Sequence, residues 1–281
     1  MGNQTRFSYD ARDRLVRETD PVGNAINYQY DAVDNLVQKI DRNGRRTDFA
    51  YDDLNRLLTE TWVNADESTA NDVQYTYDPV SNVASAMDAF SALSFIYDAR
   101  DRVTTVDNSG SPDAPQVVLR YSYDLAGNVL SVADTIGGQA AGVTSYVYDG
   151  LNRNSQITQS GNGVQDKRVD LRYNSLSQFA SIDRYSELTG TQLVVSSSYD
   201  YDNLNRLSSL THSNTASPVA FYDFEYDSAS RITKITDVDR ATDYTYDTRG
   251  QLLSTVHSDS AQPDEQYDYD ANGNRSHDNL N

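Results

Sequence analysis

The feature that most constrains this chain is a short phrase that it repeats. Residues 51–60 read YDDLNRLLTE, residues 148–157 read YDGLNRNSQI and residues 201–210 read YDNLNRLSSL. The opening tyrosine recurs twelve times, at spacings of 20 to 28 residues. The twelve are Tyr9, Tyr30, Tyr51, Tyr77, Tyr97, Tyr123, Tyr148, Tyr173, Tyr201, Tyr226, Tyr246 and Tyr269. Such a period is typical of repeat architectures, in which each unit is one supersecondary element.

The positions around each tyrosine follow one template. Asp comes next in eleven copies, with Asn174 as the exception, and an aromatic residue stands two positions earlier in eleven copies, with Leu171 as the exception. Four positions after the tyrosine comes Gly, Asn, Asp or Ser in every copy, and Arg, Asn or Gln follows. An apolar residue then comes in ten copies; Asn154 and Arg275 break that rule. The template uses nineteen of the 21 tyrosines, so it accounts for the unusual tyrosine content.

This template predicts a β-hairpin. Aromatic residues two positions apart lie on one face of a strand, because strand side chains alternate. The Asp suits the first position of a type I turn, where its carboxylate accepts a local backbone N–H. Gly, Asn or Asp three residues later suits the left-handed position of a turn followed by a G1 bulge. Pro79, directly after Asp78, stands where such a turn favours proline.

The array predicts an all-β fold of about twelve tandem antiparallel hairpins, in one unit spanning residues 1–281 without a domain boundary. No apolar pattern of period 3.6 persists, so helix should be scarce. A β-propeller with six blades of four strands is an alternative fold. Its sequence should repeat in pairs of hairpins, but the spacings between the tyrosines show no such alternation. Twenty-four strands make a strip roughly 115 Å wide. We therefore expect a curved, spiralling single-layer sheet, part of a hollow shell or barrel.

Composition excludes several classes of function. The formal charge of −19 argues against binding to nucleic acid and against polybasic membrane attachment. Cysteine is absent, which excludes disulfides and thiolate sites. No apolar run approaches the length of a membrane span, so we expect no membrane insertion, and the N-terminal residues show no signal peptide.

The chemistry-bearing residues favour a structural role. Residues 268–273 imitate the first half of a calcium loop, but Asn279 stands where a bidentate Glu is needed. His212, His257 and His277 lie in or beside polar connections and are interpreted as exposed surface residues. The carboxylates are periodic with the hairpins, and no nucleophile elbow occurs. We predict no catalytic, cofactor-binding or metal-binding residues, no cofactor, and no enzymatic activity.

The unit [FY]-x-Y-D-x-x-[GNDS]-[RN]-[LV], with TDPVGN at 19–24 and DRNG at 41–44, resembles the RHS/YD repeat. That repeat occurs in bacterial Rhs polymorphic toxins, in the B and C components of insecticidal toxin complexes, in wall-associated proteins and in teneurins. The resemblance covers essentially the whole chain. It implies a spiral strip of sheet that forms a hollow shell, which in the toxins encloses a C-terminal effector.

The resemblance implies two functions. The first is the wall of an encapsulating shell of a toxin-delivery protein, with an enclosed effector or further shell repeats as partners. The alternative is a cell-surface adhesion or recognition module that binds proteins or glycans. Open strand edges also allow edge-to-edge self-association. The family's DPxGL-type core motif is matched only in its first half, at residues 20–24, so we expect a fragment of a longer array. We expect the protein to be secreted or held at the cell surface. It would reach that location through a dedicated export system or as part of a longer parent chain.

Overall fold

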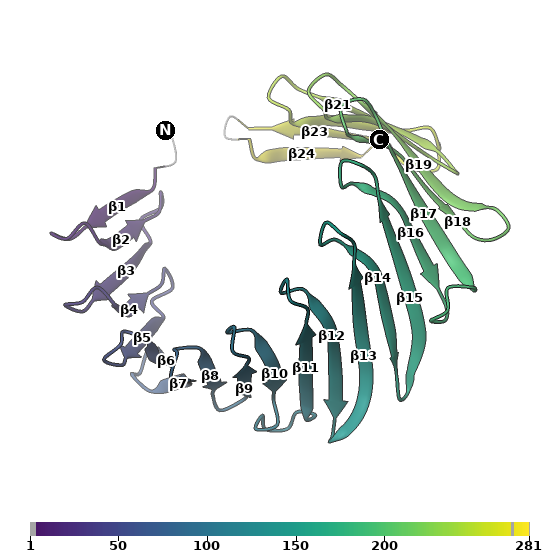
Figure 1. Cartoon of the computed structure of the whole chain (residues 1–281). Helices are drawn as coiled ribbons and strands as arrows, with labels where there is room; N and C mark the ends of the chain where they lie inside the picture. The colour runs from purple at the N-terminus through teal and green to yellow at the C-terminus, as the bar shows by residue number, and fades with distance from the viewer. Residues whose placement is uncertain (1–3, 271–272, 281) are drawn as a thin grey trace. The chain divides into compact units, whose positions relative to one another are not determined.

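The computed structural model describes residues 4–270 and 273–280, except for the side chains of residues 276–280. The chain divides into two compact units, Met1–Gly142 and Val143–Asn281. Strands follow one another along both units (Figure 1). The strands are β1 (Arg6–Tyr9), β2 (Leu15–Thr19), β3 (Ala25–Tyr30), β4 (Leu36–Ile40), β5 (Arg46–Tyr51), β6 (Leu57–Val63), β7 (Thr69–Tyr77), β8 (Val83–Met87), β9 (Ala92–Tyr97), β10 (Val103–Asp107), β11 (Val117–Tyr123), β12 (Val129–Ile136), β13 (Gln139–Tyr148), β14 (Asn154–Gly161), β15 (Val164–Tyr173), β16 (Phe179–Tyr185), β17 (Leu193–Tyr201), β18 (Leu207–Ser213), β19 (Pro218–Tyr226), β20 (Ile232–Asp237), β21 (Ala241–Tyr246), β22 (Leu252–His257), β23 (Glu265–Tyr269) and β24 (Arg275–Leu280).

Each unit is a meander of antiparallel strands. In the N-terminal unit, β1 pairs with β2, β2 with β3, and so on to β11 with β12. In the C-terminal unit the same order runs from the β14–β15 pair to the β23–β24 pair. The part of the chain that the structure describes contains no helix, and therefore none long and apolar enough to cross a membrane. The predicted all-β class of tandem antiparallel hairpins is confirmed.

The hairpin turns have the predicted geometry. The residue four positions after the tyrosine has positive φ in all twelve copies, for example 58° at Asn55, 96° at Gly127 and 76° at Ser81. In the copy that begins at Tyr51, the Asn55 N–H donates to the Asp52 carbonyl at 2.9 Å, and the Asp52 N–H donates to the Arg56 carbonyl at 2.9 Å. The strand register shifts by one residue next to the tyrosine. These are the marks of a type I turn followed by a bulge.

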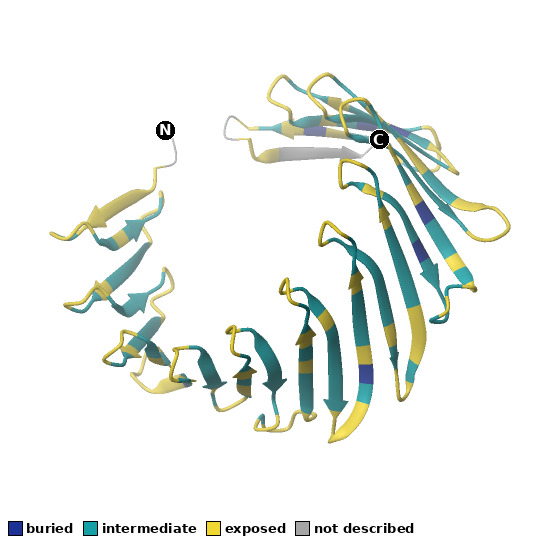
Figure 2. Cartoon of the chain, in the orientation of Figure 1, coloured by how far each residue is buried: buried dark blue, intermediate teal, exposed yellow. Residues whose placement is uncertain are grey.

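The two faces of the sheet differ in exposure. The residue between the paired aromatics is exposed in every copy, for example Gln29, Thr76 and Glu225. From the second copy onward the aromatics themselves are half-buried, and Tyr267 is the single buried apolar residue among those described. Figure 2 shows exposed turns joined by strands that are mostly of intermediate burial. A single layer has no opposite sheet to bury its aromatic face, so the rings are covered only by their neighbours along that face.

Candidate functional site

The Asp that follows the repeat tyrosine closes its own hairpin tip, and Asn174 does the same in the copy without an Asp. In the copy that begins at Tyr97, Asp98 Oδ1 accepts the N–H groups of Arg100 at 2.8 Å and of Arg102 at 3.1 Å. Asp98 Oδ2 accepts Arg102 Nε at 2.8 Å. The hydrogen bond from the Arg102 side chain, aided by the backbone bonds, lowers the pKa of the Asp98 carboxyl to about 2. The carboxylate is therefore occupied by its own turn.

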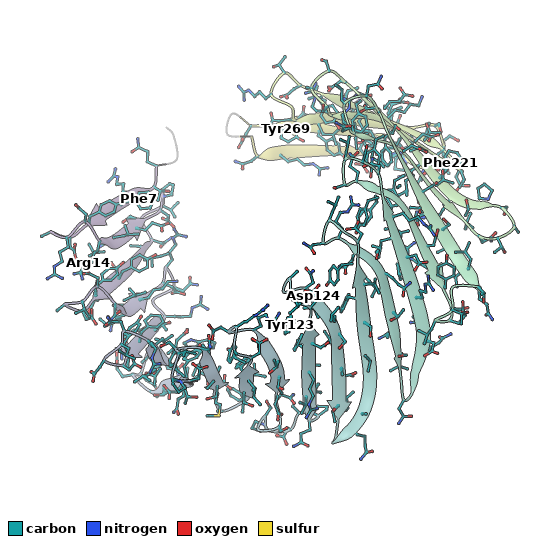
Figure 3. The ribbon with its side chains drawn as sticks, in the orientation of Figure 1. Phe7, Arg14, Tyr123, Asp124, Phe221 and Tyr269 are labelled. Atoms are coloured by element: carbon teal, nitrogen blue, oxygen red, sulfur yellow. The ribbon has the colours of Figure 1, made fainter. Side chains whose placement is uncertain are left out.

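The Arg at the end of the same tip reaches the next hairpin. Arg102 Nη1 donates to the Asp124 carbonyl at 3.0 Å, and its guanidinium lies 4.4 Å from the centre of the Tyr123 ring. Tyr123 and Asp124 lie together at one hairpin tip (Figure 3). A guanidinium over a tyrosine face is a cation–π contact. The same stacking occurs at Arg14–Tyr30, Arg56–Tyr77, Arg153–Tyr173, Arg206–Tyr226 and Arg231–Tyr246.

The tyrosine hydroxyl points back to the preceding hairpin. Tyr123 Oη donates to the Val103 carbonyl at 2.6 Å, where the return strand of the preceding hairpin begins. The same bond joins Tyr30 to Leu15, Tyr51 to Leu36, Tyr77 to Leu57, Tyr97 to Val83, Tyr173 to Asn154, Tyr201 to Phe179, Tyr226 to Leu207, Tyr246 to Ile232 and Tyr269 to Leu252. We call the Asp closure, the Arg reach and the tyrosine bond together the tip interlock.

The tip interlock explains the YD phrase as architecture. Asp fixes the turn, while Tyr and Arg connect consecutive hairpins at the same edge of the sheet. Sequence reasoning assigned the ring to a face and the Asp to a turn, but it missed where the hydroxyl and the guanidinium bind. Their targets are backbone carbonyls, which every residue type supplies, so no residue in the sequence marks them.

A row of apolar side chains stands exposed on the turns. The residues lie two or three positions after the tyrosine, at the outermost point of the tip. Their exposed fractions include 67% at Leu54, 68% at Val80 and 87% at Leu125 in the N-terminal unit. In the C-terminal unit they include 69% at Leu151 and 67% at Leu204. We call these residues the tip row; exposed apolar side chains in series are suited to contacts with a partner.

The interpretation of the histidines as exposed is wrong for two of them. His212 is half-buried on β18, and its Nδ1 lies 2.9 Å from Oγ of Ser197, which is fully buried. His257 is half-buried on β22, with Nδ1 3.1 Å from Thr242 Oγ1. Both pairs are cross-strand register partners, so the ring is held by the opposite strand. The side chain of His277 lies outside the described residues.

The calcium-like segment is a hairpin tip. Asp270 Oδ1 accepts the Asn274 N–H at 2.9 Å, and Asp270 Oδ2 accepts the Asn274 side chain at 3.1 Å, while residues 271–272 lie outside the described residues. Within the described ranges, no three His, Cys, Asp or Glu side chains gather closely enough to hold a metal ion. The predictions of no catalytic and no cofactor-binding residues stay predictions.

Comparison with known families identifies the repeat. A family model described as RHS Repeat matches residues 1–25 and 30–61, and one described as Teneurin YD-shell matches residues 174–281. The chain carries RHS/YD repeats. Its repeats form a shell-type scaffold. No curated protein matches this RHS/YD-repeat chain.

Three solved structures are similar at low identity. The crystal structure of TcdB2-TccC3-TEV has 12% identity and a TM-score of 0.39, over 99% of this chain and 18% of that chain. A structure of the Photorhabdus luminescens Tc holotoxin pore has 13% identity and a TM-score of 0.36, over 98% and 18%. A porin-like protein from Bacteroides uniformis has 12% identity and a TM-score of 0.30, over 91% of both chains. This chain thus spans 18% of the length of the Tc chains that it matches.

Proposed function

We propose that this RHS/YD-repeat chain is the wall of an encapsulating shell in an Rhs-type toxin-delivery protein. The observation that carries the proposal is the tip interlock, in which Asp closes each turn while the tyrosine hydroxyl and, at the arginine tips, the guanidinium join one hairpin to the next without a second layer. Such a strip can be extended by any number of further hairpins, and one face of its sheet stays available to an enclosed partner. The matches to the RHS Repeat and Teneurin YD-shell models support a shell.

The role is non-catalytic in this proposal. The carboxylate that recurs in the repeats is used in closing the turns, as at Asp52, Asp98 and Asp227. At Asp98, two backbone N–H groups and both Nε and Nη2 of Arg102 occupy the four lone-pair directions of the carboxylate, so none is directed toward a substrate. The periodic acidic residues are therefore structural supports and give the shell its negative charge.

The proposed partners are an enclosed effector and further shell repeats of the same parent protein. Strand β1 pairs with β2, and all four of its residues are exposed, so it is suited to edge-to-edge pairing with another strand. We propose no nucleic-acid partner and no membrane insertion, in keeping with the charge of −19. The proposed location is outside the cell or at its surface, reached through a dedicated export system or a longer parent chain.

A protection experiment tests encapsulation. The complete reading frame is expressed, and limited proteolysis with mass spectrometry follows the segment beyond this array. We expect that segment to resist cleavage in the intact protein and to become cleavable in a Tyr123→Ala variant, whose tip interlock is broken. Lys167→Gln, at an exposed strand position, is the matched control. Equal cleavage in the intact protein, or a reading frame without any further segment or co-purifying partner, contradicts encapsulation.

A recognition module is the second candidate. It is favoured by the tip row, since serial exposed apolar side chains such as Leu54 and Leu204 mark a contact surface. Replacing Leu54, Val80 and Leu125 together with Ser should abolish binding to a cell or protein surface if recognition is the function. Under encapsulation, the same triple variant should keep its cargo protected.

A further inference from the structure

A notch opens at the edge of the sheet opposite the hairpin tips, where β8 is shorter than its neighbour β7 (Figure 1). Strand β7 pairs with β6 over residues 69–74, but with β8 only over residues 74–77. The first half of β7 therefore has no strand on its β8 side. The notch measures about 390 Å³, and its lining includes Asn71 and Asp72 of β7, Met87 of β8 and Asp88 of the turn that follows β8.

Asp88 gives the notch a negative charge without a basic partner. Its Oδ1 accepts the N–H groups of Phe90 at 2.8 Å and of Ser91 at 2.7 Å, which closes the turn, and its Oδ2 accepts Asn71 Nδ2 at 2.9 Å. The bond from Asn71, aided by the backbone bonds, lowers the pKa of the Asp88 carboxyl to about 2, so this group is ionised at neutral pH. Among the described residues, no Lys, Arg or His nitrogen lies within ion-pair distance of it.

Asn71 is the second unusual residue of the notch. It is only 8% exposed, and its Oδ1 has no hydrogen-bond partner and almost no contact with solvent. A buried acceptor without a partner costs free energy, which a donor supplied by a ligand would recover. Because Nδ2 of the same planar amide binds Asp88, the unpaired oxygen lies beside the carboxylate. A rotation of the amide would direct Oδ1 toward a cation that binds Asp88.

The C-terminal unit contains the same turn with a cation of its own. Asp237 occupies the same place in its repeat as Asp88, eleven residues after the repeat tyrosine. Its Oδ1 likewise accepts two N–H groups of the turn, both at 2.9 Å. Arg240 Nε lies 3.8 Å from Asp237 Oδ2, whereas the equivalent residue in the notch is Ser91. The carboxylate of the notch therefore lacks the internal cation that its counterpart has.

We propose that the notch binds the primary ammonium of a lysine side chain from a partner polypeptide. The ammonium pairs with Asp88 Oδ2 and donates to Asn71 Oδ1, while the alkyl stem packs along Met87. The partner's backbone contacts the unpaired side of β7 in the same notch. A net charge of −19 favours a basic partner.

Lysine is favoured over arginine at this site. A guanidinium gains most from a fork that uses both oxygens of a carboxylate, but Asp88 Oδ1 is already occupied by the turn. A calcium ion is disfavoured, since it takes six to eight oxygen ligands and the notch offers few that are free. This inference does not rest on the proposed shell function.

The test follows the side-chain amide of Asn71 by NMR in the isotope-labelled chain. We expect a saturable shift with the peptide acetyl-Ala-Lys-Ala-amide, and binding about tenfold weaker when the lysine ammonium is acetylated, because a charge-assisted contact is lost. Ser91→Arg should abolish the saturable shift, because the introduced guanidinium takes the place that Arg240 has beside Asp237. Ser91→Gln, a long side chain without charge, is the matched control and should preserve it.

A second measurement removes dependence on the Asn71 resonance. Fluorescence anisotropy of a labelled lysine peptide should show weaker binding to Asn71→Leu, while circular dichroism reports whether the strands persist. Equal binding of the charged and acetylated peptides, or no saturable change with either, overturns the proposal. Tighter binding of acetyl-Ala-Arg-Ala-amide or of calcium chloride also overturns it. Equal binding of n-butylammonium overturns the assignment to a polypeptide, since a free amine would then suffice.

Discussion

Two neighbouring hairpin tips of the N-terminal unit, residues 78–82 and 98–102, close alike but connect differently to the next hairpin. Asp78 Oδ1 accepts the N–H groups of Val80 at 3.0 Å and Asn82 at 2.8 Å, just as Asp98 accepts those of its own turn. Asp78 Oδ2 accepts Asn82 Nδ2 at 3.0 Å, where the other tip has an arginine. The turn thus needs the aspartate, and it accepts either partner five positions after the tyrosine.

The difference lies in how far that partner reaches. Asn82 extends only to Asp101 Oδ1, at 3.0 Å, on the next tip. Arg102 binds the Asp124 carbonyl and also covers the Tyr123 ring. Residue identity at one position therefore sets how tightly successive hairpins are held, while the hairpin itself is unchanged. The array is uniform in fold and uneven in the strength of its links.

Removing the tyrosine ring should give the largest effect. We expect Tyr123→Ala to lower the free energy of unfolding by about 3 kcal/mol, because a half-buried ring, its hydroxyl bond and the Arg102 contact are lost together. Tyr97→Ala should lower the free energy of unfolding by less, because the preceding tip carries Asn82 in place of an arginine. Urea unfolding followed by circular dichroism measures both. Equal losses would show that the arginine contact adds nothing.

Truncating the linking residue should have an intermediate effect. We expect Arg102→Ala to cost about 1–2 kcal/mol through the lost charge-assisted bonds and ring contact. Asn82→Ala should cost about half as much, and Asn82→Arg should raise stability if the longer side chain reaches the Asp98 carbonyl. Melting temperatures of the three variants compare them. A lower melting temperature for Asn82→Arg would contradict the view that reach decides link strength.

Removing only the hydroxyl should have a smaller effect, equal in the two copies. Tyr123→Phe and Tyr97→Phe each delete one bond to a carbonyl, at 2.6 Å and 2.8 Å, and should each cost about 1 kcal/mol. Amide hydrogen exchange should show faster opening of the preceding hairpin in both variants. Markedly different losses would mean that the tyrosine bond depends on the arginine.

The smallest effect per site is a dependence on acid. The pKa of Asp98 is lowered to about 2 in the folded chain by Arg102 and by backbone N–H groups, against about 3.9 in an unfolded chain. The folded state therefore binds fewer protons, so the stability from this carboxylate is complete above about pH 4 and is lost as the pH falls toward 2.

The tip at residues 78–82, which carries Asn82 in place of an arginine, provides a comparison for this dependence on acid. Partial burial acts to raise the pKa of Asp78, but the bonds from Asn82 and the backbone outweigh it, so this pKa is also lowered. We expect Asp98→Asn to flatten the curve of melting temperature against pH, between pH 4 and 2, more than Asp78→Asn does. An identical flattening would assign the acid sensitivity to the turn N–H groups common to both tips.

The sequence by itself determined the hairpins of this protein. The Tyr–Asp phrase, the small or polar residue at positive φ and the alternation of faces are local properties, fixed by backbone sterics and turn hydrogen bonds within ten residues. The sequence therefore predicts the turn conformation at Asn55 and Gly127 without knowledge of the fold. The absence of a sustained apolar period of 3.6 residues likewise predicts the all-β class.

Only the tertiary structure decided which groups meet between hairpins. The Tyr123 hydroxyl and the Arg102 guanidinium bind backbone carbonyls, which carry no sequence identity. The side chains that meet across β4, β5 and β6 depend on the register of these three strands, and connections of variable length leave that register undetermined in the sequence. For the same reason His212 proved to be held against the buried Ser197 on the neighbouring strand, because pairing across strands, and not the local sequence, sets its burial.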